Sequence, residues 1–145
     1  MAEIQSFRDL EAWQRAMDLT LLVHSASSKL PSDERFGLIS QMRRAAMSVP
    51  TNIAEGQSFG KGGRYINHVR IALGSLGELS TELEIALRLK YFTSAEAEKV
   101  LEQVIRTRQL VFGLLRSLRR HRLAEVAKTT LIGVSAWWLS VAILG

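Results

Sequence analysis

Hydrophobic residues recur at steps of three and four along four stretches of the chain, which is typical of amphipathic helices. The first stretch covers residues 7–29 and ends before Pro31, and the second begins near Ser32. The third ends at residues 90–92, and the fourth continues to about Arg122. Short connections favour antiparallel neighbours, so the pattern predicts an all-α, up-down-up-down four-helix bundle. The positions predicted to face its core are Leu10, Trp13, Met17, Leu21, His24, Phe36, Ile39, Met42, Ala46, Val49, Ile66, Val69, Leu73, Leu76, Leu83, Leu87, Val100, Val104, Val111, Leu114 and Leu118.

Proline, glycine and capping residues add local detail. Pro50 lies inside the second helical pattern and predicts a kink there, because proline lacks a backbone N–H. Residues 56–63 contain four glycines and are predicted to form a loop. Gly74 and Gly77 lie inside the third pattern and predict a close crossing with another helix. The segment Thr93–Glu96 has the capping-box pattern that begins a helix.

The composition fits one small folded domain and excludes cysteine chemistry. The chain has 145 residues, no cysteine and a net charge of +5, which excludes disulfides, thiolate nucleophiles and zinc fingers. The charge alternates along the chain: it is −3 over residues 1–34, +5 over 35–70, −3 over 71–102 and +6 over 103–145. A net positive charge indicates, weakly, an anionic partner such as nucleic acid or a membrane surface.

No pattern in the chain indicates catalysis, a metal or a cofactor. The glycine-rich segment does not match a phosphate-binding P-loop, because Gly56 and Gly60 enclose three residues and a helix precedes them. A carboxylate-bridged metal pair in a bundle needs Glu-x-x-His, but Leu21, Tyr65 and Leu118 stand three residues before the histidines. We therefore expect a protein that is not an enzyme and that has neither a cofactor nor a metal site.

Arginine is concentrated in the second and fourth helices. The guanidinium group suits bidentate contacts to phosphate, so this concentration favours nucleic-acid binding. An equal alternative is that the basic helices face acidic helices of a neighbouring subunit, in which case the charge serves assembly. The candidate nucleic-acid-binding residues are Arg43, Arg44, Lys61, Arg64, Arg70, Arg108, Arg116, Arg119 and Arg120.

A second set of polar residues follows the predicted helices two and three. Gln41, Arg44, Ser48, Asn52 and Glu55 recur at steps of three and four, and Glu78 lies on the third helix. One interpretation is a solvated face of little energetic weight. The other is a polar seam between the helices, in which Arg44 pairs with Glu78 and Asn52 caps the kinked backbone. Such a seam would set helix register or an oligomer contact.

Three blocks of the sequence resemble a known family. They are FRDLEAWQRA at residues 7–16, QMRRAAMSVPTNIAEG at residues 41–56 and IALGSLGELSTEL at residues 71–83. These blocks resemble the four-helix-bundle proteins encoded in intervening sequences of bacterial large-subunit ribosomal RNA, over about residues 7–120. The middle block is the most specific of the three.

The resemblance implies a bundle that assembles into a homo-oligomeric ring, commonly a pentamer. A protein similar to this family is an accessory factor to the reverse transcriptase of diversity-generating retroelements, where a basic surface engages nucleic acid and the polymerase. The resemblance therefore implies RNA or DNA as a ligand and a reverse transcriptase as a partner. It assigns no individual binding residue.

The end of the chain departs from the family pattern. Residues 129–145 carry no charge and, as a helix, would span about 25 Å, slightly less than a membrane core. We expect residues 1–123 to form the bundle and residues 124–145 to form an extra helix that packs on the bundle or on a neighbouring subunit. A membrane tail anchor and an unstructured extension are the alternatives. Since the N-terminus lacks the apolar stretch of a signal peptide, we expect a cytoplasmic protein, or alternatively one anchored in the cytoplasmic membrane.

Overall fold

The computed structural model describes residues 6–144, with the side chains of residues 6–130. Two short 3-10 turns precede the first two α-helices, and no β-strand occurs in the described part of the chain. The predicted all-α four-helix bundle is confirmed. Its elements are η1 (Phe7–Asp9), α1 (Glu11–Ser27), η2 (Ser32–Arg35), α2 (Leu38–Ser58), α3 (Gly63–Arg88) and α4 (Ser94–Leu144).

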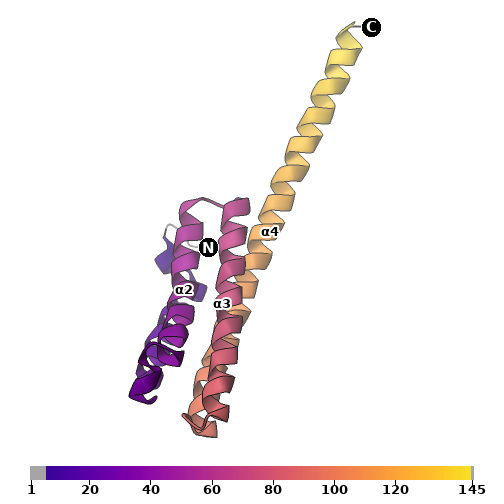
Figure 1. Cartoon of the computed structure of the whole chain (residues 1–145). Coiled ribbons are helices and arrows are strands. Elements are labelled where there is room, and N and C mark those ends of the chain that lie inside the picture. Colours follow the sequence, from indigo (N-terminus) through magenta and orange to yellow (C-terminus); the bar gives the residue numbers. More distant parts are fainter. Residues whose placement is uncertain (1–5, 145) are drawn as a thin grey trace.

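The helices run alternately up and down, and each connection is short (Figure 1). Helix α2 packs against α1 and α3, while α4 packs against α3 and α1, so the four helices enclose one core. The loop between α2 and α3 lies at the end of the bundle from which α4 projects (Figure 1).

Helix α4 continues beyond the bundle as one uninterrupted helix (Figure 1). The expectation that the fourth helix ends near Arg122 and that a separate helix follows is therefore wrong. Its 51 residues correspond to a length of about 75 Å. Residues 114–132 contain neither glycine nor proline, so nothing there interrupts the helical hydrogen bonds. Residues 119–130 are all exposed.

Within the described residues, no helix is long and apolar enough to cross a membrane. The expected membrane anchor concerns residues 129–145, and the expected helix packed on the bundle concerns residues 124–145. From residue 131 on, the side chains of this segment lie outside the described part of the chain.

The core contains most of the predicted positions, with three clear exceptions. Leu21 is 66% exposed, His24 is exposed, and Phe36 is 87% exposed. In α1 a different face is buried. The alanines on this face allow close packing, but alanine is only weakly hydrophobic, so the hydrophobic pattern of the sequence does not single them out. Phe36 precedes the start of α2, so the helical phase does not extend to it. The buried residues of α1 are Ala12, Ala16, Leu19, Val23 and Ser27.

The second helix begins at Leu38, not near Ser32, because Glu34 caps it. The Glu34 Oε2 atom accepts a hydrogen bond from the Leu38 N–H at 3.0 Å, and the Tyr91 hydroxyl donates to Glu34 Oε1 at 3.1 Å. A Cβ atom at position 37 would lie 2.7 Å from Glu34 Oε2, so Gly37 leaves room for the carboxylate. Glu34 thereby joins the start of α2 to the segment that follows α3.

Pro50 lies within α2 and leaves the carbonyl of Ala46 without its usual helical donor. The Thr20 hydroxyl, from α1, lies 3.1 Å from this carbonyl and 2.8 Å from the carbonyl of Ala16. The expectation that Asn52 caps the kinked backbone is therefore wrong for the freed carbonyl. Asn52 Nδ2 donates instead to the carbonyl of Ser48 at 2.9 Å.

The close approach of two helices occurs at Gly56, not at Gly74 and Gly77 as predicted. A Cβ atom at position 56 would collide with the ring of Tyr65 and would lie 2.9 Å from His68 Cβ. Cβ atoms at positions 74 and 77 would meet no atom within 4 Å. The predicted loop at residues 56–63 is also shorter, because α2 continues to Ser58 and α3 begins at Gly63.

The contact between Thr20 and the Ala46 carbonyl can be tested with a double-mutant cycle. We expect Thr20→Val to lower the free energy of unfolding by about 1 kcal/mol, because it leaves this carbonyl without a donor. In a Pro50→Ala background the cost should be smaller, since residue 50 then supplies a backbone N–H. Urea unfolding of the four proteins measures both costs. Equal costs in the two backgrounds would contradict the assignment.

Gly56 and Gly74 provide a matched pair of substitutions. We expect Gly56→Ala to destabilise the protein by about 1–3 kcal/mol, because the methyl group overlaps the ring of Tyr65. Gly74→Ala should stabilise it by up to about 1 kcal/mol, because alanine favours a helix and meets open space. Thermal unfolding followed by circular dichroism measures both changes. A stabilising Gly56→Ala substitution would show that the two helices are not in close contact there.

The hydrogen bonds at the start of α4 predict that the protein loses stability at acid pH. The predicted capping box is confirmed: Thr93 N–H donates to Glu96 Oε2 at 3.0 Å and Glu96 N–H donates to Thr93 Oγ1 at 3.3 Å. Lys29 Nζ also donates to Glu96 Oε1 at 2.8 Å. The bond from Lys29, followed by those from Thr93, lowers the pKa of the Glu96 carboxyl from 4.5 to about 2.

Because the folded state holds this pKa below its unfolded value, the stabilisation by Glu96 is fully present above about pH 4.5. It should disappear as the pH falls toward 2. We therefore expect Glu96→Gln to lower the melting temperature at pH 6 and to have progressively less effect between pH 4.5 and 2. Glu98→Gln, on the same turn, is the control and should show no such trend. A Glu96→Gln effect that is constant with pH would exclude this origin.

Candidate nucleic-acid interface

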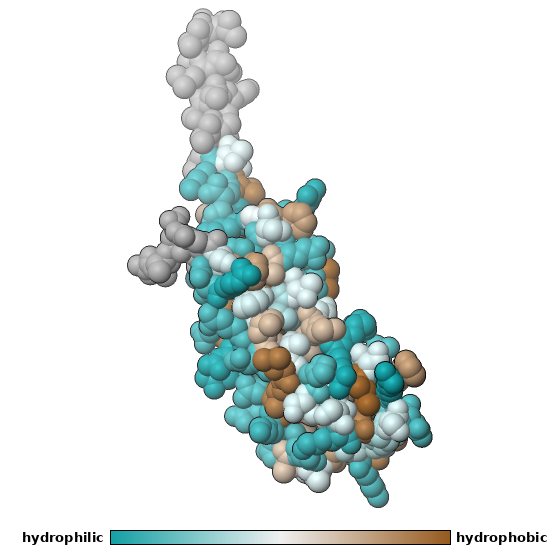
Figure 2. Space-filling model, turned by 90° about the vertical axis from the view of Figure 1, so that its left-hand side faces the viewer, coloured by the Kyte–Doolittle hydropathy of each residue, from teal (hydrophilic) through white to brown (hydrophobic). Residues whose placement is uncertain are grey.

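Basic side chains from three elements meet at the end of the bundle from which α4 projects. The α2–α3 loop contributes one lysine, the first two turns of α3 contribute two arginines, and α4 contributes four. On the face shown in Figure 2, mostly hydrophilic side chains surround the root of the projecting helix. We refer to this set as the basic end; it comprises Lys61, Arg64, Arg70, Arg116, Arg119, Arg120 and Arg122.

Two hollows lie in the surface of the basic end. One, of about 440 Å³, is lined by Arg70, Arg119 and Arg122. The other, of about 430 Å³, is lined by Arg116, Arg119 and Arg120. Arg119 and Leu123 line both hollows, so the two adjoin. Their lining combines guanidinium groups with the apolar side chains of Ile66, Leu123 and Val126.

The spacing of the arginines along α4 and the absence of a side chain at Gly63 bring these groups together. Arg116, Arg119 and Arg120 follow one another at steps of three and one on α4, while Leu115 and Leu118 of the same helix are buried in the core. The Arg122 Nη1 atom lies 3.5 Å from the point that a Cβ atom on Gly63 would occupy. The missing side chain at the start of α3 therefore leaves room for the Arg122 guanidinium.

The charges of the basic end are not neutralised by acidic side chains. Within residues 6–130, none of its seven cations forms an ion pair. The described residues that line the two hollows include no aspartate or glutamate. Since like charges repel, a bound anion would lower the electrostatic energy of this surface.

An aromatic ring lies beside these cations. Phe59, at the end of α2, is 45% exposed, and its ring stacks on the His68 imidazole with 5.5 Å between the ring centroids. The Arg64 guanidinium carbon lies 5.4 Å from the centroid of the same ring. Aromatic and guanidinium planes of this kind are surfaces on which nucleobases stack.

The structure brings six of the nine predicted cations to the basic end and places the other three elsewhere. Arg43 Nε donates to Ser27 Oγ at 2.9 Å, which joins α2 to α1. Arg44 pairs with Glu78, and Arg108 lies over the ring of its neighbour Phe112 on α4. Arg122 was not among the predicted residues, although its position three residues after Arg119 was a usable signal.

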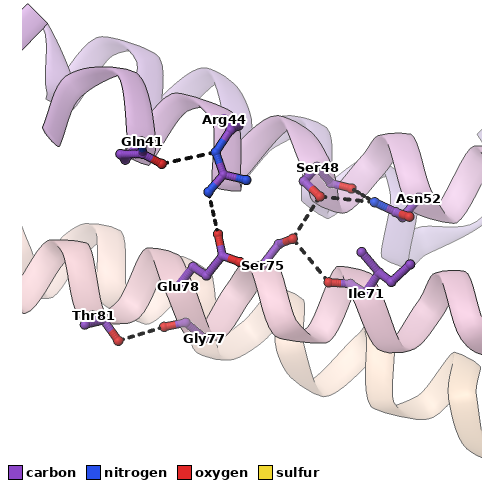
Figure 3. A network of polar contacts seen from close by, with 9 residues as sticks. All are labelled: Gln41, Arg44, Ser48, Asn52, Ile71, Ser75, Gly77, Glu78 and Thr81. Carbon is purple, nitrogen blue, oxygen red and sulfur yellow. Dashed lines mark hydrogen bonds and ion pairs between the residues drawn. The ribbon is translucent and has the colours of Figure 1, made fainter. Parts of the chain in front are cut away.

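The polar residues predicted on α2 and α3 form a ladder of contacts between the two helices (Figure 3). At one end Arg44 Nη2 donates to Glu78 Oε2 at 2.9 Å, as expected, and Arg44 Nε donates to Gln41 at 3.1 Å. In the middle the Ser75 hydroxyl donates to Ser48 Oγ at 2.8 Å. The ladder is solvated at the ion pair, where Arg44 is 60% exposed, and buried at Ser75, which is 4% exposed.

At its other end the ladder reaches His68. The Asn52 Oδ1 and His68 Nδ1 atoms are 3.0 Å apart, and Glu55 Oε2 lies 3.8 Å from the same nitrogen. Sequence reasoning missed Ser75 and His68, although His68, Ser75 and Glu78 are spaced by seven and three along α3. The set is therefore a solvated face at the Arg44–Glu78 ion pair and a polar seam between the helices at Ser75.

Near the ladder, one carboxyl group on α3 is poorly solvated. The Oε2 atom of Glu82 is buried and has no hydrogen-bond partner among the described residues. Burial, and secondarily the charge of Glu78, raises the pKa of the Glu82 carboxyl. Within residues 6–130, no three His, Asp or Glu side chains are placed to hold a metal ion together.

Comparison with known proteins identifies the family and the fold of the chain. No curated protein matches the chain. A crystal structure of a protein of unknown function from the S23 ribosomal protein family of Bacteroides thetaiotaomicron has a similar fold, with a TM-score of 0.67 and 20% sequence identity. The similarity covers 72% of this chain and 95% of the other chain. The family model of the 23S rRNA-intervening sequence proteins matches residues 8–113, which contain all of the three resembling blocks except Phe7, and the chain belongs to this family.

Proposed function

We propose that the protein is a non-enzymatic binding module that holds RNA at its basic end. The observation that carries the proposal is the pair of adjoining hollows lined by Arg70, Arg116, Arg119, Arg120 and Arg122, without a carboxylate among their described lining residues. Guanidinium groups bind phosphate oxygens in pairs, and they stay charged at any physiological pH.

Binding of this kind depends on charge more than on base sequence. Each phosphate that meets a guanidinium releases counterions, so the affinity falls as the salt concentration rises. Phosphate contacts position a strand but carry no sequence information. The exposed ring of Phe59, with Arg64 over it, would add stacking to any base. We therefore expect tight, salt-sensitive binding with little sequence preference.

A second candidate function is a structural homo-oligomer. Leu101, Ile105 and Phe112 are 40%, 51% and 42% exposed and lie on one face of α4, which favours a contact with another subunit. The family resemblance adds a pentameric ring and a reverse transcriptase as a partner. The two functions are compatible, since a ring would present several basic ends to one strand and so raise its affinity.

The proposed function predicts that three arginines control RNA binding. We expect the triple variant Arg70→Gln, Arg119→Gln, Arg122→Gln to bind a labelled single-stranded RNA at least roughly ten-fold more weakly. It should also lower the slope of log K against log salt by roughly 2, at about 0.7 per phosphate contact on a single strand. Fluorescence anisotropy over a salt series measures both quantities.

The matched control is the triple variant Arg35→Gln, Arg106→Gln, Arg108→Gln, which makes the same change in net charge elsewhere on the surface. It should retain most of the affinity. An equal loss in both triple variants would mean that only net charge matters, and the proposal for the basic end would then be wrong. Failure of the wild-type protein to bind RNA at low salt would overturn the proposed function as a whole.

A further inference from the structure

Helix α4 leaves the bundle and continues with no other element of the described chain beside it (Figure 1). Among residues 6–130, Leu118 is the last one that is buried, and residues 119–130 are all exposed. Residues 119–144 correspond to about 39 Å of helix. The core of the bundle therefore ends near Leu118 and does not use the projecting part of α4.

The last part of α4 is uncharged, and its apolar positions surround the helix axis. Residues 129–144 contain no Asp, Glu, Lys or Arg. At about 100° per residue, the positions of leucine, isoleucine, valine, alanine and tryptophan fall on every side. The remaining residues are threonine, serine and glycine, which are small and uncharged. We refer to residues 129–144 as the uncharged end of α4.

This pattern distinguishes between the surroundings that such a helix can have. A helix that is apolar all round belongs in a protein core or in a membrane. The backbone of the uncharged end projects away from the core of this chain (Figure 1). A helix that pairs with a second copy has one apolar seam and a polar outer face, with charged residues beside the seam. The pattern therefore favours lipid over a second copy of the chain.

The residues that lead into the uncharged end match the chemistry of a bilayer surface. Lys128 directly precedes it, and Arg122 lies about 10 Å before it along the helix axis. Leu123 and Val126 are 70% and 57% exposed, and both line a hollow with Arg122. Cations beside exposed apolar side chains suit the zone in which lipid headgroups meet acyl chains. The Glu125 carboxylate pairs with Lys128 at 3.0 Å and offsets part of this charge.

We propose that the uncharged end of α4 inserts into a lipid bilayer, with the basic end at the bilayer surface. Its length of about 24 Å fits within a hydrocarbon core about 30 Å thick, and a helix satisfies its own backbone hydrogen bonds there. Arg122 lies at about the distance, roughly 10 Å, over which an anionic surface attracts a charge at 0.1 M salt. This inference does not rest on the proposed function, because the bundle stays outside the hydrocarbon.

Flotation of the full chain with phosphatidylcholine vesicles tests insertion. We expect the wild type to float, and the double variant Val134→Asp, Leu139→Asp to lower the ratio of bound to free protein at least about ten-fold. The reason is that two carboxylates would enter the hydrocarbon. The matched control is Leu123→Asp, Val126→Asp, which makes the same charge change before the uncharged end. It should keep the ratio within about three-fold, since charges at headgroup level stay hydrated. Circular dichroism first establishes that both variants are folded.

The tryptophans of the chain report whether the uncharged end enters the acyl chains. Trp137 and Trp138 lie in this segment, and the third tryptophan, Trp13, packs against Phe7 with 5.1 Å between the ring centroids. We expect vesicles with bromine on their acyl chains to quench the fluorescence of the wild type. The double variant Trp137→Phe, Trp138→Phe stays apolar, so it should float equally well and lose this quenching.

Vesicles that contain about one third phosphatidylglycerol separate insertion from binding at the surface. We expect the ratio of bound to free protein to rise at least about three-fold over neutral vesicles, because the cations before the uncharged end meet anionic headgroups. Inserted protein should stay bound when the salt is raised to about 1 M, since only the electrostatic part of the binding is screened.

Three results would overturn the proposal. One is an equal loss of flotation in the two aspartate variants, or no flotation with neutral vesicles. The second is binding to anionic vesicles alone that high salt reverses, which would mean that only the basic end binds lipid phosphates. The third is a dimer in light scattering whose Trp137 and Trp138 are not quenched by brominated lipid, which would mean that a second copy covers the segment.

The RNA titration contains no lipid, and Val134→Asp, Leu139→Asp keeps all seven cations of the basic end. RNA binding by this variant therefore shows whether the proposed function stands when insertion fails.

Discussion

The packing of α2 against α3 at Gly56 is the constraint on which the rest of the structure depends. The absence of a side chain there lets the ring of Tyr65 and the backbone of α2 come into contact, at the point where a short loop joins the two helices. That contact fixes the register of α3 from its first turn. The ladder along the same interface, through Ser48 with Ser75 and Arg44 with Glu78, needs this register to bring its polar atoms within hydrogen-bond distance. A one-residue shift would break the ladder.

The fold class was predictable because it depends on local signals. Helical spacing, short connections and the Thr93–Glu96 capping box operate within a few residues, and the structure confirms them. The buried face of α1 was not predictable in this way, because Leu19, Leu21 and Val23 all lie on one helix and only packing decides which of them is covered. The same holds for the close contact at Gly56, which depends on a ring nine residues further along the chain. Sequence spacing shows where a helix can pack closely but not where it does.

The candidate site was predictable in part. Six of the nine predicted cations lie at one end of the bundle, since the loop and α4 pass each other there. Arg43 and Arg44 looked the same in the sequence, but their partners Ser27 and Glu78 come from α1 and α3. The pocket lined by Leu10, Tyr65 and Leu118 could not be predicted, because its lining comes from α2, α3, α4 and the residues that precede α1 and α3.

The alternating charge of the chain has a physical consequence that depends on these pairings. Within the described residues, Glu78 pairs with Arg44 and Glu96 with Lys29, both away from the α2–α3 loop. Glu125, three residues after Arg122 on α4, pairs with Lys128 further along the helix. The carboxylates thus neutralise cations outside the basic end, and the net positive charge of the protein is concentrated there. Since the cations of the basic end are exposed and take no part in the core or the ladder, an anion can bind them without disturbing the contacts that hold the bundle together. Substitutions in the basic end would therefore change the binding of an anion without changing the stability of the fold.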